Sequence, residues 1–162
     1  MNMLERLLGH DLATTRELLL LCQGLTDEQM DRDIDAGWRT LRTTFAHMIG
    51  NIEGWTDLMM ERPVRREFGA ASVSELLVRL ERGYADFAGF ALQVEREGRL
   101  DDLFTDVLDQ PPVQKSIGGA IGHVITHNMH HRAEVLHMMH RLDMSNLPEG
   151  DLMGWDQRRR LA

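Results

Sequence analysis

The sequence has one cysteine and no long apolar run, and both absences narrow the class of protein. Cys22 is the only cysteine in 162 residues, so the chain cannot close an internal disulfide. The apolar run at residues 18–22 is far shorter than the roughly 20 residues that a helix needs to cross a bilayer. The first residues also lack the apolar leader of a secreted protein. We therefore expect a cytoplasmic protein with neither a membrane span nor a disulfide.

Positive charge is also scarce. The chain has 18 lysines and arginines against 26 aspartates and glutamates, which gives a formal net charge of -8. Phosphate backbones and anionic lipid surfaces attract basic proteins, so neither nucleic acid nor a membrane surface is an expected partner. The one basic run, at residues 158–160, lies in the C-terminal tail and is interpreted as a solvated charge cluster without a function.

Sustained alternation of apolar and polar residues, which is typical of a half-buried strand, is missing as well. Four segments instead place apolar residues at spacings of three and four, which predicts amphipathic helices. These helices should cover about residues 2–22, 40–60, 72–97 and 116–142. The prediction is an all-α fold, a single four-helix-bundle domain over residues 1–162, with residues 143–162 as a tail packed back on the bundle.

Capping and turn residues separate the four segments. Ser72 and Glu75 match the S-x-x-E capping box of a helix start, and Gly98 is typical of a helix end. The connections at residues 23–39 and 99–114 are each about 16 residues long, more than a helix hairpin needs, so we expect crossover connections there. Glycines 118, 119 and 122 predict irregular first turns or close packing at the start of the fourth helix.

Histidine is concentrated in the fourth predicted helix, which holds six of the eight in the chain. Successive residues of a helix point about 100° apart, so each direction can be compared with the apolar stripe. His131 lies in the middle of that stripe, and His127 lies about 40° from it. The other four point about 80° or more away: His123, His130, His137 and His140. Because His127 and His131 are about 6 Å apart along the axis, both imidazoles can reach one metal ion.

The H-x-x-x-H pair is a weak motif by itself. Histidines on the buried side of a helix often only form hydrogen bonds, so a site without a metal stays open as the alternative. Asn128 follows His127 where zinc proteases have a glutamate, which excludes a protease of that class.

A third ligand has to come from another helix. His47 is the only histidine in the middle of one, and it forms a small polar stripe with Asn51 and Gly54 beside the apolar one. Periodicity leaves its direction open, since an exposed His47 fits the pattern equally well. Asp11 and Thr15 of the first helix also lie near an apolar stripe, where they could line a site or face solvent.

The second and fourth predicted helices resemble those of the DinB family, also called YfiT-like. The resemblance rests on residues 39–48 with Trp55 and on the H-x-x-x-H-R-x-x-V pattern at residues 127–135, and it extends over nearly the whole chain. It implies a four-helix bundle in which His47, His127 and His131 bind one metal ion, usually zinc or nickel. It also implies a homodimer.

The motif departs from the family pattern at one point. Family members often have glycine and then glutamine after the H-R pair, where this chain has Ala133 and Glu134. A carboxylate at this position could orient His127 or His131 by accepting a second N–H, or it could simply be solvated. Both interpretations of Glu134 stay open.

Three neutral imidazoles suit zinc, nickel or iron, of which zinc is the first expectation. Three protein ligands leave coordination positions for water or substrate, as in catalytic sites. Some members of the family that the sequence resembles are transferases that activate a low-molecular-weight thiol such as bacillithiol or mycothiol. The leading hypothesis is a metal-dependent transferase or hydrolase of a small-molecule substrate, most concretely a thiol-dependent S-transferase. No residue is identified as catalytic.

Two other hypotheses fit the same sequence. One is a noncatalytic bundle in which the ion only holds the second and fourth helices together. The other is a metal-free homodimer module that pairs through a methionine-rich surface. That surface would consist of Met59, Met60, Met138 and Met139.

Overall fold

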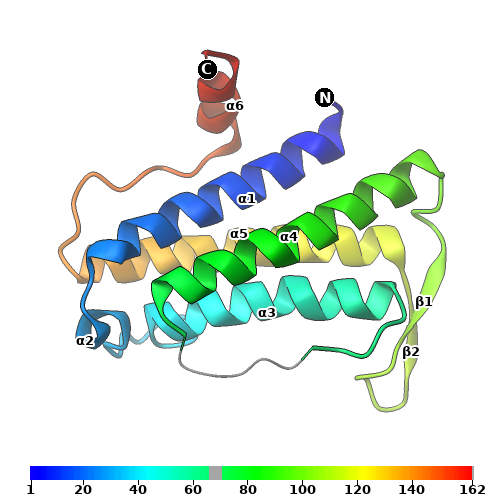
Figure 1. Ribbon diagram of the computed structural model, residues 1–162, viewed down its shortest axis with the longest axis horizontal. Coiled ribbons are helices and arrows are strands. Elements are labelled where there is room, and N and C mark those ends of the chain that lie inside the picture. The colour runs from blue at the N-terminus through cyan, green and yellow to red at the C-terminus, as the bar shows by residue number, and fades with distance from the viewer. Residues whose placement is uncertain (66–70, 162) are drawn as a thin grey trace.

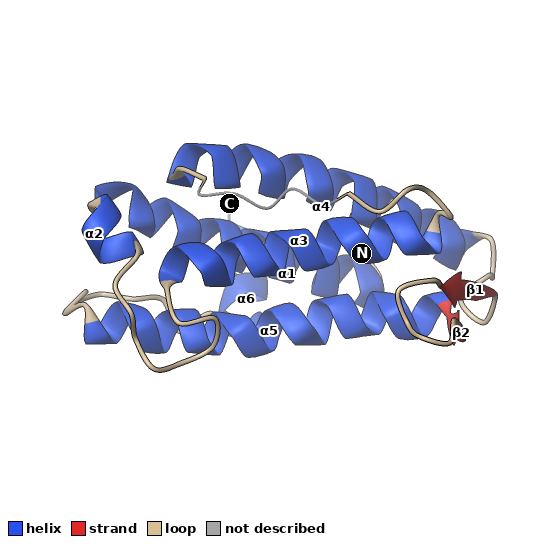
Figure 2. Cartoon of the chain, turned by 90° about the horizontal axis from the view of Figure 1, so that it is seen from below, coloured by secondary structure: helices blue, strands red, loops and turns tan. Residues whose placement is uncertain are grey.

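Four long helices run side by side along the length of the molecule (Figure 1 and Figure 2). The computed structural model describes residues 1–65 and 71–161. The long helices are α1 (Met3–Leu21), α3 (Leu41–Met59), α4 (Val73–Arg96) and α5 (Ile117–Arg141). Both α1 and α3 pack against α4 and against α5. This arrangement confirms the prediction of an all-α bundle.

Each long helix begins directly after a capping residue. The side chain of that residue accepts a hydrogen bond from a backbone N–H of the first turn, which has no acceptor within the helix. The four capping residues are Asn2, Thr40, Ser72 and Ser116. Ser72 and Glu75 form the capping box that the sequence predicts. The starts of the helices are therefore encoded locally.

The long helices do not simply alternate in direction. α1 and α5 run one way along the bundle, and α3 and α4 run the other way (Figure 1). The end of α3 and the start of α4 therefore lie at opposite ends of the bundle. The two connections in which crossovers were expected instead join antiparallel helices (Figure 1), and both contain short elements. These elements are the 3-10 turn Cys22–Gly24, α2 (Asp27–Met30), β1 (Leu103–Asp106) and β2 (Val113–Ser116).

The hairpin of β1 and β2 was not expected from the sequence. The strands pair antiparallel, with Leu103 opposite Ser116. Each strand has four residues, which is too short for an alternating pattern to stand out from the neighbouring loop. Gly118, just inside α5, donates its N–H to the Leu100 carbonyl at 2.7 Å, and a Cβ on Gly118 would lie 3.0 Å from that oxygen. The start of α5 is thus regular and closely packed.

The core lies between the four long helices and is mainly aliphatic and aromatic. Its largest fully buried side chains include Leu18, Phe45, Ile52, Leu80, Tyr84 and Phe87. Cys22 is buried there too, and burial raises the pKa of its thiol to about 12, which keeps it protonated and unreactive. Within residues 1–65 and 71–161, no helix has both the length and the apolar content of a bilayer span.

The proposed methionine-rich surface is wrong. Met59, Met138 and Met139 are buried, and of the four methionines only Met60 is exposed. The physical reason is that α5 packs against both α1 and α3, which covers Met138 and Met139, and that Met59 belongs to the core at the end of α3.

The C-terminal tail contains a further helix, α6 (Leu152–Leu161), which packs on the outside of α1 (Figure 1). The Trp155 ring lies against α1 at Gly9, where a Cβ would come within 2.9 Å of it. Asp156 pairs with Arg6 of α1 and with Arg160 of its own helix. Polar contacts therefore hold much of α6, and an analysis of apolar stripes does not detect such a helix.

Candidate metal centre

Three histidines converge where α3 packs against α5. The Nε2 atom of His127 lies 2.9 Å from that of His47 and 3.0 Å from that of His131. His127 and His131 are one turn apart on α5, and His47 reaches them from α3. His131 is buried, whereas His47 and His127 are half-buried. The structure thus brings together all three histidines named from the sequence, in a group that is closed on one side and accessible from the other.

The donor set fits a single metal ion. Three imidazole nitrogens at about 2.0–2.1 Å from one tetrahedral ion lie about 3.3 Å apart, only a few tenths of an ångström more than the separations seen here. The three Nε2 atoms can all reach one point, since the candidate ligand atoms lie within 4.8 Å of one another. This group could therefore hold a metal ion.

The neighbouring histidine on α5 points elsewhere. The His130 side chain is 69% exposed, whereas that of His131 is 7% exposed, in agreement with their directions on the helical wheel. His130 does not join the three converging nitrogens. Its Nε2 instead lies 3.1 Å from Glu134, which it shares with His131.

Glu134 answers the question that the sequence left open, because it contacts His131 and not His127. Its Oε2 lies 2.6 Å from His131 Nδ1. When Nδ1–H donates to the carboxylate, the lone pair of the ring is on Nε2, the atom that faces the other two histidines. Glu134 therefore sets both the tautomer and the orientation of His131.

Burial favours the neutral form of two of the three histidines. Burial lowers the pKa of His47 to about 4, and the positive charges that His131 and His127 would carry add to this effect. Burial also lowers the pKa of His127, again assisted by neighbouring histidines. Neutral imidazoles have the free lone pair that a metal ligand needs. At neutral pH both side chains are thus in the ligand state.

Trp38 covers the His47 side of the group and was not predicted from the sequence. Its ring stacks on His47 with centroids 4.3 Å apart and an angle of 26° between the planes. The preceding Gly37 has a φ of +49°, and a Cβ on it would overlap the Glu134 carboxylate. The chain before α3 therefore packs closely on the site. A single tryptophan in a loop carries no pattern that would have revealed this contact.

A row of rings continues from the site along α5. His123, which is exposed, stacks on His127 with centroids 5.2 Å apart. Its other neighbour is Trp55 of α3, also at 5.2 Å in an edge-to-face arrangement. Lys115 Nζ lies 5.0 Å from the centre of the Trp55 ring. The group of three histidines is therefore continuous with an aromatic surface between α3 and the start of α5.

Asp11 and Thr15 do not line the site. Asp11 is fully buried, pairs with Arg132 and accepts a hydrogen bond from Asn128 Nδ2 at 3.0 Å. Thr15 Oγ1 lies 3.3 Å from Arg132 Nη1. Burial raises the pKa of Asp11, and the positive charge of Arg132 opposes that rise. This cluster lies between α1 and α5, on a different side of α5 from the three histidines.

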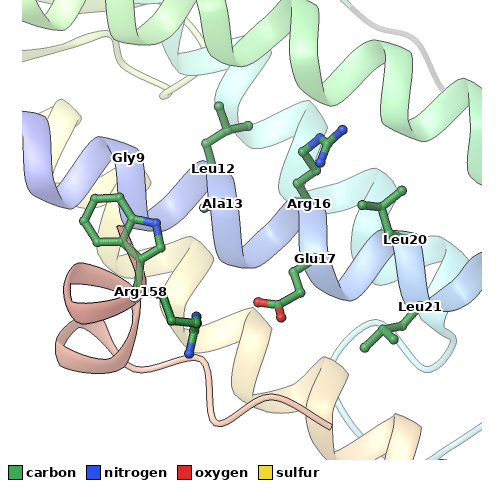
Figure 3. A pocket seen from close by; sticks show the side chains of 9 residues that line it. Gly9, Leu12, Ala13, Arg16, Glu17, Leu20, Leu21 and Arg158 are labelled. Atoms are coloured by element: carbon green, nitrogen blue, oxygen red, sulfur yellow. The ribbon is translucent and has the colours of Figure 1, made fainter. Parts of the chain in front are cut away.

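A hollow of about 620 Å³ lies between α1 and α6 (Figure 3). Its walls are mainly apolar, with Leu12 and Leu20 from α1 and Trp155 from α6. Its charged lining residues are Arg16, Glu17 and Arg158. None of the described residues that line it is a histidine. It is therefore separate from the candidate metal centre.

Comparison with protein-family models matches most of the chain. Residues 1–144 match the model of the DinB family. The matched part contains the four long helices and the three converging histidines, and it ends before α6. No curated protein matches the chain.

Proposed function

The chain belongs to the DinB family, and from this premise we propose that it is an enzyme whose divalent metal ion is held by His47, His127 and His131. The observation that carries the proposal is the convergence of three imidazole Nε2 atoms, two pairs of them 2.9 Å and 3.0 Å apart. Zinc is the preferred ion, because neutral nitrogen ligands in a tetrahedral arrangement suit it, and nickel and iron are the alternatives.

Partial exposure of the site favours a catalytic ion over a purely structural one. Three protein ligands leave at least one coordination position, and the half-buried His47 and His127 leave one side of the group accessible. When bound, such an ion lowers the pKa of a thiol or a water molecule and makes it a nucleophile near neutral pH. We propose a thiol-dependent S-transferase as the most concrete function and a hydrolase as the other form.

The protein's own residues prepare the site in two ways. Glu134 holds the proton at Nδ1 of His131, so that Nε2 presents its lone pair. Trp38 covers one face of the His47 ring and limits the access of water from that side. The substrate is thus expected to approach along the uncovered side, towards His127 and His123.

Metal analysis and cobalt substitution test this proposal. Untagged protein should contain about one zinc, nickel or iron ion per chain after dialysis, because one set of three converging histidines supports one ion. In the cobalt protein, bacillithiol or mycothiol should produce sulfur-to-cobalt charge-transfer absorption. Metal content near zero that added metal does not restore would contradict the metal site.

The spectra also separate the forms of the proposal. A thiol response followed by turnover of an electrophile supports the transferase. Bound cobalt with no response to any thiol favours the hydrolase. A spectrum that neither thiols nor anions change favours an ion that only joins α3 to α5.

A further inference from the structure

A second hollow, of about 380 Å³, lies beside the candidate metal centre. Its floor is the face of α3 that continues from His47, and its walls come from Val64 and Arg65 after α3 and from the β1–β2 hairpin. Lining residues include Gly50, Asn51, Gly54, Trp55, Val64 and Leu108. Its volume is within the range of ligand pockets, roughly 300–1,000 Å³.

Two glycines create the space on the helix floor. Nothing in the described part of the chain lies within 4 Å of a Cβ placed on Gly50, and one placed on Gly54 would meet only Val64, at 3.9 Å. Glycine weakens a helix interior relative to alanine, so two glycines on one face are unfavourable for the helix alone. Here they leave room for another group against α3.

Asn51 is the polar group of this floor. Its Nδ2 atom is buried and has no hydrogen-bond partner in residues 1–65 and 71–161. A buried donor without an acceptor is unfavourable, and an acceptor atom of a ligand would satisfy it. The charged lining residues, by contrast, are already paired, Arg65 with Asp57 at 2.8 Å and Asp106 with Lys115 at 2.7 Å.

The hollow is connected to the three histidines by two routes. Along α3, Gly50 and Asn51 follow His47 by about 4.5 and 6 Å of helix rise. The second route passes through aromatic rings: Trp55 lines the hollow and contacts His123, which stacks on His127. A molecule whose reacting atom lies at the histidines can therefore place its remaining atoms in the hollow.

We infer that this hollow binds the apolar part of the substrate, with Asn51 donating a hydrogen bond to an oxygen on it. The inference rests on the proposed metal site. It assigns the substrate to small molecules with an uncharged aliphatic or aromatic chain that carries one acceptor atom. A charged chain is disfavoured because no unpaired charge among the described lining residues would meet it.

Alkyl hydroxamates on the cobalt protein test the inference. The head group binds the metal and the chain then occupies the hollow, so acetohydroxamate reports on the metal and longer homologues report on the hollow. Burying each methylene should tighten the Kd about fourfold until the hollow is full, up to about hexanohydroxamate. The visible spectrum of cobalt gives each Kd without any activity assay.

Two leucine substitutions form a matched pair. Gly50→Leu fills the hollow, whereas Gly89→Leu adds the same side chain to the exposed face of α4, where nothing lies within 4 Å in the described chain. Both replace a helical glycine, so their effects on helix stability should be similar. We expect both variants to bind acetohydroxamate like the parent. Only Gly50→Leu should lose the dependence on chain length.

Asn51→Leu removes the donor and keeps a side chain of similar size. For each ligand, the Kd of the variant is divided by the Kd of the parent. This ratio should be at least about fivefold larger for keto analogues of the longer hydroxamates than for the plain chains. Equal ratios for every keto position would overturn the role of Asn51.

The possible failures are distinguishable. If acetohydroxamate does not bind the cobalt protein, the proposed function fails and the inference fails with it. If acetohydroxamate binds but longer chains bind no tighter, the hollow is not a substrate pocket. The same conclusion follows if Gly50→Leu keeps the full dependence on chain length.

Discussion

Replacing Glu134 by alanine should weaken metal binding while leaving the fold intact. The Glu134 carboxylate lies 2.6 Å from Nδ1 of His131 and fixes the tautomer in which Nε2 has the lone pair. Removal of such a partner typically lowers metal affinity about 10- to 100-fold. Because Glu134 is only half-buried at the edge of the bundle, its loss opens no cavity in the core. The defect should therefore be confined to the metal-bound state.

The expected size follows from linkage between binding and folding. At a free metal concentration about 1,000 times Kd, an ion that binds only the folded chain adds about 4 kcal/mol to the free energy of unfolding. A site about 30-fold weaker adds about 2 kcal/mol at the same concentration. For a chain of this length, the difference of about 2 kcal/mol corresponds to a decrease in Tm of about 4–8 °C.

Competition with a chromophoric chelator measures Kd, and calorimetry with zinc and after chelation measures Tm. Glu134→Ala should melt earlier than the parent in zinc and close to the parent without it. His130→Ala is the matched control, since His130 is the other histidine on the same carboxylate, at 3.1 Å, and is largely exposed. It should bind zinc within about twofold of the parent. Parent-like zinc affinity in Glu134→Ala would refute the assigned role.

Two further predictions concern histidines of the site, and a third concerns the oligomeric state. His131→Ala should lose the metal and the thermal stabilisation that zinc gives, whereas His130→Ala should keep both. A zinc titration measures this, and the reverse result would mean that the wrong face of α5 was assigned. In metal-free protein the folded state lowers the pKa of His47 to about 4, against 6.5 for a free side chain. The unfolded chain therefore takes up the proton first, and the free energy of unfolding should decrease as the pH falls from 6.5 to 4. Urea unfolding at several pH values checks this, and His47→Gln should show a shallower decrease; equal slopes would contradict it. Light scattering should give twice the chain mass of 18.6 kDa at micromolar concentration if the protein is the homodimer that the family suggests, and the mass of one chain would refute that prediction.

The long helices were predictable because their information is local. The stripe of apolar residues and the Ser72–Glu75 capping box predict a helix at about residues 72–97, and α4 covers Val73–Arg96. The β1–β2 hairpin and α6 were not predicted, for two different reasons. The strands are too short for a period of two to be recognised, and α6 depends on contacts such as Arg6–Asp156 that join residues 150 positions apart. Such contacts become visible only when the fold is known.

In the candidate site, too, some features follow from local helix geometry and others depend on the folded conformation of a loop. The directions of His127, His130 and His131 follow from helix geometry, which is fixed by the sequence positions alone. The contact of Trp38 with His47 depends instead on a loop whose Gly37 and Arg39 have positive φ values of 49° and 71°. No periodic pattern encodes that conformation. The choice of Glu134 between two histidines, by contrast, is local: Glu134 is three residues from His131 and seven from His127 on the same helix.

The arginine of the H-x-x-x-H-R pattern, Arg132, contacts α1 and not the three histidines. Asn128 and Arg132 follow His127 and His131 by one residue, so they point about 100° away from them, towards α1. There both contact the buried carboxylate of Asp11. A buried ion pair adds little net stability, but loss of one partner is typically costly, by about 3–5 kcal/mol.

Rotation of α5 about its axis would incur that cost, because Asp11 would remain in the core without its partners. The same rotation would move His127 and His131 away from His47. The contacts to α1 therefore hold the helix at the angle at which the histidines meet, although none of them touches the site. In the H-x-x-x-H-R pattern, the two histidines supply the proposed ligands, and the arginine fixes the rotation of the helix that presents them.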